Sequence, residues 1–199
     1  MIKEALLIFA KNPIAGKVKT RLAATIGNEE ALVVYQHLLL HTVSVTEDLP
    51  VEKFVFYSDH VEVEDIWQAK HYLKDLQKGN DLGDRMHNAF ASIFHKGYSK
   101  AVIIGTDCPG LSTLILMKAF VQLESYDVVI GPAEDGGYYL LGLKEPQEQL
   151  FKDIKWSTNM VLDETTRRCA DSGLQYYLLP VLNDIDDEKD LRTMEQLKP

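Results

Sequence analysis

The sequence has little cysteine, with only Cys108 and Cys169 among its 199 residues. These two lie far apart and fit neither a CxxC metal motif nor the dense cysteine spacing of disulfide-stapled secreted domains. We therefore expect two reduced thiols. A chain of this length can bury a sizeable hydrophobic core without a crosslink or a structural metal. We expect a single domain that spans residues 1–199.

Long apolar runs are also missing. The apolar segments at 5–10 and 38–40 are far shorter than the ~20 residues that cross a bilayer. The first residues do not show the basic, apolar and small-residue regions of a signal peptide. We therefore expect a cytoplasmic protein with no membrane span.

The chain lacks an excess of positive charge, since 21 Lys and Arg stand against 30 Asp and Glu and the formal net charge is -9. A protein that binds duplex nucleic acid usually carries the opposite field, so no nucleic-acid partner is expected. Hydrophobic residues make up 46% and charged residues 26%, which is typical of a folded globular protein and not of a disordered chain. Small molecules are the expected partners.

Short apolar segments rich in β-formers alternate with segments of helical period, and this order predicts an α/β domain with a largely parallel sheet. Predicted strands cover 5–10, 54–57, 101–105, 127–130, 138–143 and 176–181, with a weaker one at 72–77. Predicted helices cover 29–46, 82–94, 113–123, 158–170 and a short last segment, with Asn28, Asp81, Ser112, Ser157 and Asp187 as N-caps. In open α/β sheets ligands bind beyond the carboxyl ends of the strands, so the site is sought there.

Four cations fall within eleven residues directly after the first predicted strand. They are Lys11, Lys17, Lys19 and Arg21. Together with Gly16, which permits close backbone approach, they suit the phosphates of a nucleotide. The segment is neither a P-loop nor a GxGxxG fingerprint. A solvated basic loop is the alternative.

Asp107 follows an otherwise apolar strand, where a carboxylate suits a hard cation such as Mg²⁺. It also fits an ordinary turn, because Pro109 and Gly110 come next. A second acidic segment lies near the end of the chain, where Asp184 and Asp186 follow a predicted strand. Either one is a candidate second metal ligand, although the same acids can cap and stabilise the last helix.

The segment 131–143 gathers acids, glycines and tyrosines before a strand. Glu134 and Asp135 can bind hydroxyl groups or act as a general base, and Asp135 is our candidate for the base. Gly136 and Gly137 allow backbone amides to approach a ligand, while Tyr138 offers a stacking surface. A turn into the strand is the alternative interpretation.

A fifth candidate segment, 77–86, precedes a predicted helix with amides and glycines. Gln77 and Gly83 are positioned there to bind a base or a phosphate. A plain loop followed by a helix cap explains the same residues without a function.

Taken in series, these segments resemble the DUF2064 family, which is also described as selenodomain-associated transferase 1. The residues that carry the resemblance are FAKNPIAGKVKTRL, QKGNDLGDRM, IIGTDCPGL, GPAEDGGYYLLGL, the triplet Trp156-Ser157-Thr158, and LNDIDDEKDL. The family is related to MobA-like and phospholactate guanylyltransferase-like proteins. The resemblance implies a GT-A type nucleotide-diphospho-sugar transferase fold, a three-layer α/β/α sandwich around a mostly parallel mixed sheet.

The resemblance also implies roles for particular residues. Lys11, Lys19 and Arg21 would hold nucleotide phosphates, and Lys19 and Arg21 would stabilise the charge that develops in catalysis. Asp107 would hold Mg²⁺ or Mn²⁺; since a full DxD pair is missing, Asp186 would complete the ligand set.

The expected function is a metal-dependent transferase that uses a nucleotide sugar, as in glycosyl transfer, or a nucleoside triphosphate, as in guanylyl or cytidylyl transfer to a small phosphorylated acceptor. The remaining alternative is a nucleotide-binding regulatory module without turnover.

Overall fold

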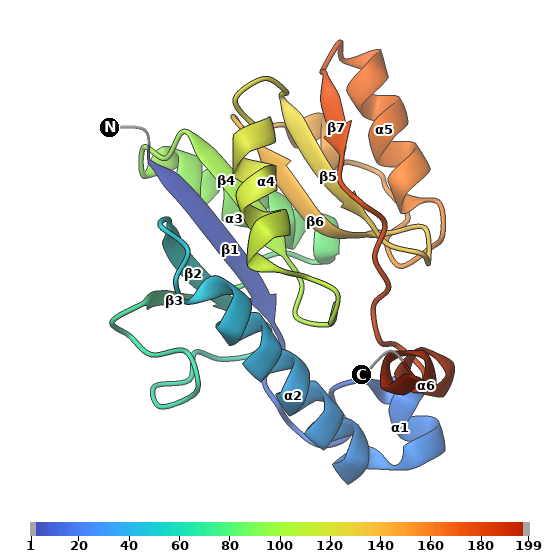
Figure 1. Cartoon of the computed structure of the whole chain (residues 1–199). Helices are drawn as coiled ribbons and strands as arrows, with labels where there is room; N and C mark the ends of the chain where they lie inside the picture. The colour runs from blue at the N-terminus through green and yellow to red at the C-terminus, as the bar shows by residue number, and fades with distance from the viewer. Residues whose placement is uncertain (1–2, 197–199) are drawn as a thin grey trace.

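The computed structural model describes residues 3–196, and over this range the strands form one seven-stranded sheet in the order β3-β2-β1-β4-β6-β5-β7 (Figure 1). The strands are β1 (Glu4–Ala10), β2 (Glu52–Tyr57), β3 (Tyr72–Leu76), β4 (Lys100–Ile104), β5 (Val128–Pro132), β6 (Tyr138–Leu143) and β7 (Tyr176–Leu178). β6 runs antiparallel to β4 and β5, and the other neighbouring strands are parallel. The predicted mostly parallel mixed sheet is confirmed.

Helices cover both faces of this sheet. They are α1 (Thr20–Ile26), α2 (Asn28–Thr46), α3 (Leu82–His95), α4 (Thr113–Gln122), α5 (Val161–Asp171) and α6 (Glu188–Gln196), with a short 3-10 turn η1 at Glu148–Leu150. α2 and α4 pack on one face, and α3 and α5 pack on the other. The three-layer α/β/α sandwich is therefore confirmed.

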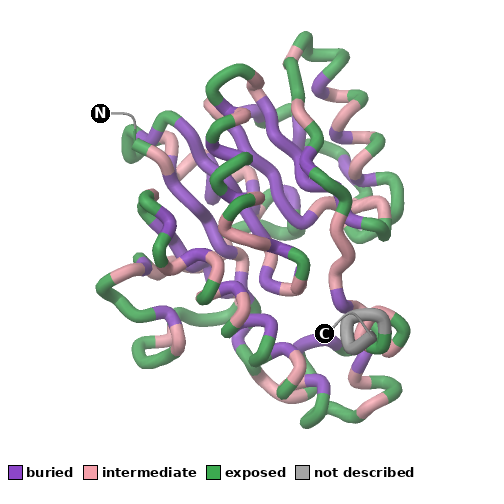
Figure 2. The backbone as a smooth tube through the Cα atoms, in the orientation of Figure 1, coloured by how far each residue is buried: buried purple, intermediate pink, exposed green. Residues whose placement is uncertain are grey.

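The central strands are continuously apolar because both of their faces are buried. Along β1, Leu6 and Ile8 join the core under α2 and α4, while Ala5 and Leu7 join the core under α3 and α5. Successive side chains of a strand point to opposite faces, which explains this alternation. Figure 2 shows the buried backbone concentrated in these strands.

A small third cluster lies away from the sheet. Leu22 of α1, Ala31 and Leu38 of α2, and Ile185 of the segment before α6 pack together, and all four are buried. This cluster anchors the end of the chain against α1 (Figure 1). It therefore brings Lys19 and Asp186, each within a few residues of a cluster member, to the same place.

Three of the predicted helix caps are confirmed. Asp81 accepts a hydrogen bond from the Asp84 amide at 2.8 Å, and Ser112 accepts one from the Ile115 amide at 3.4 Å. Asp187 Oδ1 accepts from two backbone amides of α6, at 2.8 and 3.1 Å.

Two other caps were wrong. Gly27, with φ 94°, precedes α2, and Asn28 is already the first helical residue. Ser157 has φ 61°, and its helix begins only at Val161 after Met160. In both cases a polar residue lies near the helix start, but another residue occupies the cap position.

Helix α1 is not among the helices that the sequence predicts. Leu22 is the only buried side chain of α1. The sequence of this short helix therefore shows no repeating pattern of apolar residues at helical spacing. Short helices gain most of their stability from tertiary packing, which for α1 comes from α2 and the segment before α6. β7 is also shorter than predicted and ends at Leu178.

Both cysteines are buried free thiols, as predicted. Within the described part of the chain, no helix combines the length and the apolar character needed to cross a membrane.

Asp127 joins the starts of β5 and β7. The stabilisation that its contacts provide depends on pH and can therefore be tested. Its carboxylate accepts a hydrogen bond from the Gln175 amide at 2.9 Å and lies 3.3 Å from Lys144 Nζ. These contacts hold the pKa of Asp127 below its usual value, so their stabilisation is present above the unfolded-state pKa of about 4 and is lost as the pH falls through the folded-state pKa.

We expect Asp127→Asn to lower the free energy of unfolding by roughly 0.5–1 kcal/mol at pH 7, a modest value because the side chain is 38% exposed. The difference from wild type should shrink toward pH ~3, as urea unfolding at several pH values would show. A difference that stays constant down to that pH would contradict the electrostatic explanation.

Candidate functional site

A cleft of about 920 Å³ opens beyond the carboxyl ends of β1 and β4. Its wall also includes the first residues of β6, the start of α3 and the segments 156–159 and 184–186. From β1 the chain proceeds outward through β2 and β3 and then returns to place β4 on the other side of β1. Such a switch point leaves a crevice between neighbouring strands, and ligands of open α/β sheets bind there.

Lys19 lies at the centre of the charged wall. Its Nζ is 3.1 Å from Asp107 Oδ2 and 3.2 Å from Asp186 Oδ1. The Lys19 side chain is only 6% exposed, whereas those of Asp107 and Asp186 are 39% and 46% exposed. The two predicted metal ligands, far apart in the sequence, are therefore adjacent and bridged by one ammonium group.

Electrostatics at this wall follow from burial and from the nearby carboxylates. Burial alone would lower the pKa of Lys19, but Asp107 and Asp186 outweigh it and raise the pKa above its usual value. At Asp184 burial has the largest effect. Burial first, and then the charge of Asp107, raise the pKa of its carboxyl group. Asp184 Oδ1 is buried and has no hydrogen-bond partner within the described structure.

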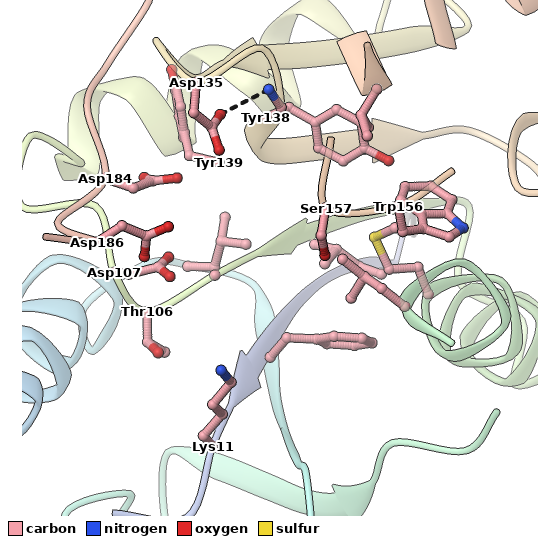
Figure 3. Close-up of a pocket in the computed structure, with 18 of the residues that line it drawn as sticks. Lys11, Thr106, Asp107, Asp135, Tyr138, Tyr139, Trp156, Ser157, Asp184 and Asp186 are labelled. Atoms are coloured by element: carbon pink, nitrogen blue, oxygen red, sulfur yellow. Dashed lines mark hydrogen bonds between the residues drawn. The ribbon is translucent and has the colours of Figure 1, made fainter. Parts of the chain in front are cut away.

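Asp135 completes an acidic side of the cleft. Figure 3 shows Asp107, Asp135, Asp184 and Asp186 together on that side, although they come from separate segments. Asp135 Oδ1 accepts a hydrogen bond from the Gly137 amide at 2.8 Å. This bond orients an exposed carboxylate toward the cleft that it lines.

Tyr35, a cleft residue that the sequence interpretation missed, ties the basic segment to β4. Its hydroxyl accepts a hydrogen bond from the Lys11 amide at 2.9 Å and lies 3.1 Å from Thr106 Oγ1. Burial raises the pKa of Tyr35 to about 12, so the hydroxyl stays protonated. In the sequence it was one of several apolar positions of a helix, and nothing there distinguishes it from a core residue.

The opposite wall is aromatic. The rings of Tyr138 and Trp156 line the cleft, but the buried Tyr138 hydroxyl and Trp156 Nε1 have no hydrogen-bond partner within the described residues. Trp156 lies directly over Gly83, where an added Cβ would come within 2.2 Å of the indole nitrogen. Ser157, at φ 61°, also lines this side (Figure 3).

Most of the predicted site residues line this one cleft. They are Lys11, Lys19, Arg21, Gln77, Asp107, Asp135, Gly137, Tyr138 and Asp186. The side-chain nitrogen of Gln77 is already engaged, because it donates to the carbonyls of Ala10 and Phe56 at 3.3 and 2.9 Å. Its structural role is therefore to join the ends of β1 and β2.

Four predicted residues are not part of the cleft lining: Gly16, Gly83, Glu134 and Gly136. Gly83 serves the packing of Trp156 instead. Gly136, at φ 86°, leaves no room for a Cβ, which would come within 2.2 Å of the Asn159 carbonyl oxygen. Glu134 is exposed, and its amide donates to the Leu182 carbonyl at 3.1 Å.

Other lining residues had no assigned role in the sequence interpretation. Arg85, Ser157 and Asn159 belong to this group. The triplet at 156–158 was part of the family resemblance, and that was the only signal that pointed to it.

The donor set fits a hard divalent cation. Over residues 3–196 no three His, Cys, Asp or Glu side chains converge as a complete metal site. Mg²⁺ nevertheless binds through one or two carboxylates together with substrate phosphates and water. Asp107 and Asp186 would supply the two carboxylates, and Asp184 Oδ1 would be a neighbouring acceptor.

Solved structures of similar fold identify the fold of this chain. A proposed nucleotide-diphospho-sugar transferase from Desulfovibrio desulfuricans G20 is 31% identical, with a TM-score of 0.88 over 98% of this chain and 87% of that one. CMP:2-keto-3-deoxy-manno-octonic acid synthetase complexed with CTP is 13% identical, with a TM-score of 0.57 over 98% of both chains. The inositol-1-phosphate CTP transferase from T. maritima is 14% identical, with a TM-score of 0.52 over 98% of this chain and 93% of that one. The last two show similarity of fold alone.

No curated protein matches the sequence significantly. The family model DUF2064, described as an uncharacterized protein conserved in bacteria, matches residues 41–158. This range contains the predicted strand-end carboxylate Asp107 and the segment 131–143, and the similarity to the Desulfovibrio protein extends over nearly the whole chain. The chain therefore belongs to the DUF2064 family and has the nucleotide-diphospho-sugar transferase fold.

Proposed function

We propose that this protein is a transferase whose donor is a nucleotide sugar and whose activity requires Mg²⁺ or Mn²⁺. The observation that carries the proposal is the pair Asp107 and Asp186. Both carboxylates contact the Lys19 ammonium group at the wall of a cleft of about 920 Å³. The same cleft offers Lys11 and Arg21 to phosphate groups. Its size accommodates a nucleotide together with a small acceptor.

Asp107 and Asp186 would hold the metal, with Asp184 beside them. A divalent cation bound there supplies charge stabilisation to phosphate oxygens and orients them. The fit rests on the two exposed carboxylates and on the buried Asp184 oxygen that has no partner among residues 3–196.

The side chains of the chain itself supply binding and proton transfer. Lys11 and Arg21 are exposed on the cleft, where they can neutralise a diphosphate as it becomes a leaving group. Asp135, oriented by the Gly137 amide, is placed to accept the proton of an acceptor hydroxyl. The aromatic wall of Tyr138 and Trp156 offers a stacking surface to a sugar or acceptor ring.

Nucleotidyl transfer is the second candidate, and a specific observation favours it. The basic segment after β1 holds four cations in eleven residues, a density that also suits a triphosphate. The similar folds with a stated reaction, which include the CTP transferase, are consistent with it. In that case an acceptor phosphate attacks the α-phosphorus and pyrophosphate leaves, whereas in glycosyl transfer a hydroxyl attacks the anomeric carbon and nucleoside diphosphate leaves.

Ligand-induced thermal stabilisation tests the binding part of the proposal. We expect one class of nucleotide sugar to stabilise the wild-type protein, by about 2.7 kcal/mol at 100 times its Kd, and only with Mg²⁺ or Mn²⁺ present. Asp107→Asn should abolish the metal-dependent part, because it removes one carboxylate of the pair. A thermal-shift panel of nucleotide sugars and nucleoside triphosphates, each with and without metal, measures both effects.

Asp171→Asn is the matched control for Asp107→Asn. It removes the same charge from an exposed ion pair with Arg167 on α5. We expect this variant to respond to metal and nucleotide as wild type does. Undiminished metal-dependent stabilisation in Asp107→Asn would place the metal elsewhere and refute the assigned site.

The products separate the candidate reactions, and Asp135 adds a second criterion. Glycosyl transfer releases nucleoside diphosphate, and Asp135→Asn should lower kcat by about 10²–10⁴-fold with little change in KM, since a hydroxyl acceptor needs a base. Nucleotidyl transfer releases pyrophosphate, and the same variant should keep its kcat because an acceptor phosphate is already ionised. Binding without either product in a turnover assay would indicate a regulatory module.

A further inference from the structure

Lys19 contacts the two carboxylates that would hold a divalent cation. Its ammonium nitrogen lies 3.1 Å from Asp107 Oδ2 and 3.2 Å from Asp186 Oδ1. Both carboxylates are exposed to the cleft by more than a third, whereas the lysine side chain is almost completely covered. Lys19 thus supplies an internal cation to a pair of acids that is open to an external one.

One ammonium group balances this acidic wall incompletely. Asp107, Asp184 and Asp186 lie together, and Arg21 adds only a longer contact, 3.6 Å from Asp186. Asp184 Oδ1 is buried and finds no partner within the described residues. A cation of charge two would attract the pair Asp107 and Asp186 more strongly than the ammonium does, because Coulomb attraction grows with charge.

The Lys19 side chain is held by the two carboxylates and not by the helix that follows it. The residue precedes α1 in the left-handed region, at φ 46° and ψ 47°, and its side chain makes no capping hydrogen bond to the helix. Such a backbone conformation costs a non-glycine residue energy, so contacts elsewhere must support it. In this protein those contacts are the two carboxylates.

We propose that Lys19 occupies the cation site of Asp107 and Asp186 in the free protein and leaves it for a phosphate of the nucleotide, so that metal and nucleotide bind together. This inference rests on the proposed function. The lysine has a flexible four-carbon stem, and the exposed cations Lys11 and Arg21 bring phosphate to the same cleft. The metal alone must displace the ammonium and therefore binds weakly, while a phosphate offers the ammonium a new partner.

The opposite role for Lys19 predicts the opposite result. A lysine that only held the two carboxylates in place would remain there when the metal binds, and removing it would disorder the ligands. Metal binding would then weaken in the variant. The sign of the change in metal affinity therefore distinguishes displacement of Lys19 from support by Lys19.

The test measures Mn²⁺ binding by electron paramagnetic resonance, with Mn²⁺ alone and with pyrophosphate as the phosphate probe. In Lys19→Met we expect Mn²⁺ alone to bind ~10-fold tighter than in wild type, since a nearby positive charge is gone. Pyrophosphate should increase Mn²⁺ affinity strongly in wild type and ~10-fold less in Lys19→Met, because the coupling between the two ligands runs through this side chain.

Lys152→Met is the matched control, because Lys152 is exposed, forms an ion pair with Glu148 and does not line the cleft. It removes the same charge and should behave as wild type in both measurements. If Lys19→Met does not fold, Lys19→Gln carries the same expectation, because it also removes the positive charge but keeps a polar group at this position. Circular dichroism establishes that each variant is folded.

Unchanged or weaker binding of Mn²⁺ alone in a folded Lys19 variant overturns the inference and leaves the proposed function intact, provided that wild type binds Mn²⁺ with pyrophosphate. Equal tightening in Lys152→Met also overturns it, because the effect would then reflect general charge. If wild type binds no Mn²⁺ even with pyrophosphate, and no nucleotide in the thermal-shift panel, the proposed function fails together with the inference.

Discussion

The site depends on one constraint of the sheet, the parallel pairing of β1 with β4 at the point where the strand order reverses. Parallel neighbours end at the same edge, so the basic segment after β1 and the Thr106-Asp107 turn after β4 meet there. Tyr35 then fixes the two segments to each other through its hydroxyl. A crevice between these strands is open because the chain leaves β1 in one direction and returns in the other.

The resulting cleft has two chemically different walls. On one side carboxylates gather around Lys19, and on the other Tyr138 and Trp156 present aromatic rings (Figure 3). Charged and aromatic surfaces serve different parts of a nucleotide sugar, since phosphates need cations or metal and rings stack on apolar faces. This division is consistent with the proposed transferase, and Asp135 lies on the acidic side.

The small cluster around Leu22 and Ile185 provides an attachment that the sheet alone would not provide, between α1, α2 and the segment before α6. It fastens α1 and the last part of the chain to α2, away from the main core. Lys19 and Asp186 flank this cluster, while Asp107 follows β4. The ion pairs of Lys19 thus connect the peripheral cluster to the sheet.

By itself the sequence determined the α/β class, the order of most strands and helices, and the segments that carry chemistry. Buried parallel strands are apolar on both faces, and special residues at their ends stand out against that background, as Asp107 and Lys11 do. Helix α1 and the caps of α2 and α5 escaped prediction, because tertiary packing and backbone turns outweigh local preference there. Only the tertiary structure decided which candidates share the cleft. Gly83 and Glu134 do not line it, whereas Tyr35 and Trp156 do. The reason is that the pairing of Lys19 with Asp107 and Asp186 joins residues 88 and 167 positions apart, a contact that no local pattern encodes.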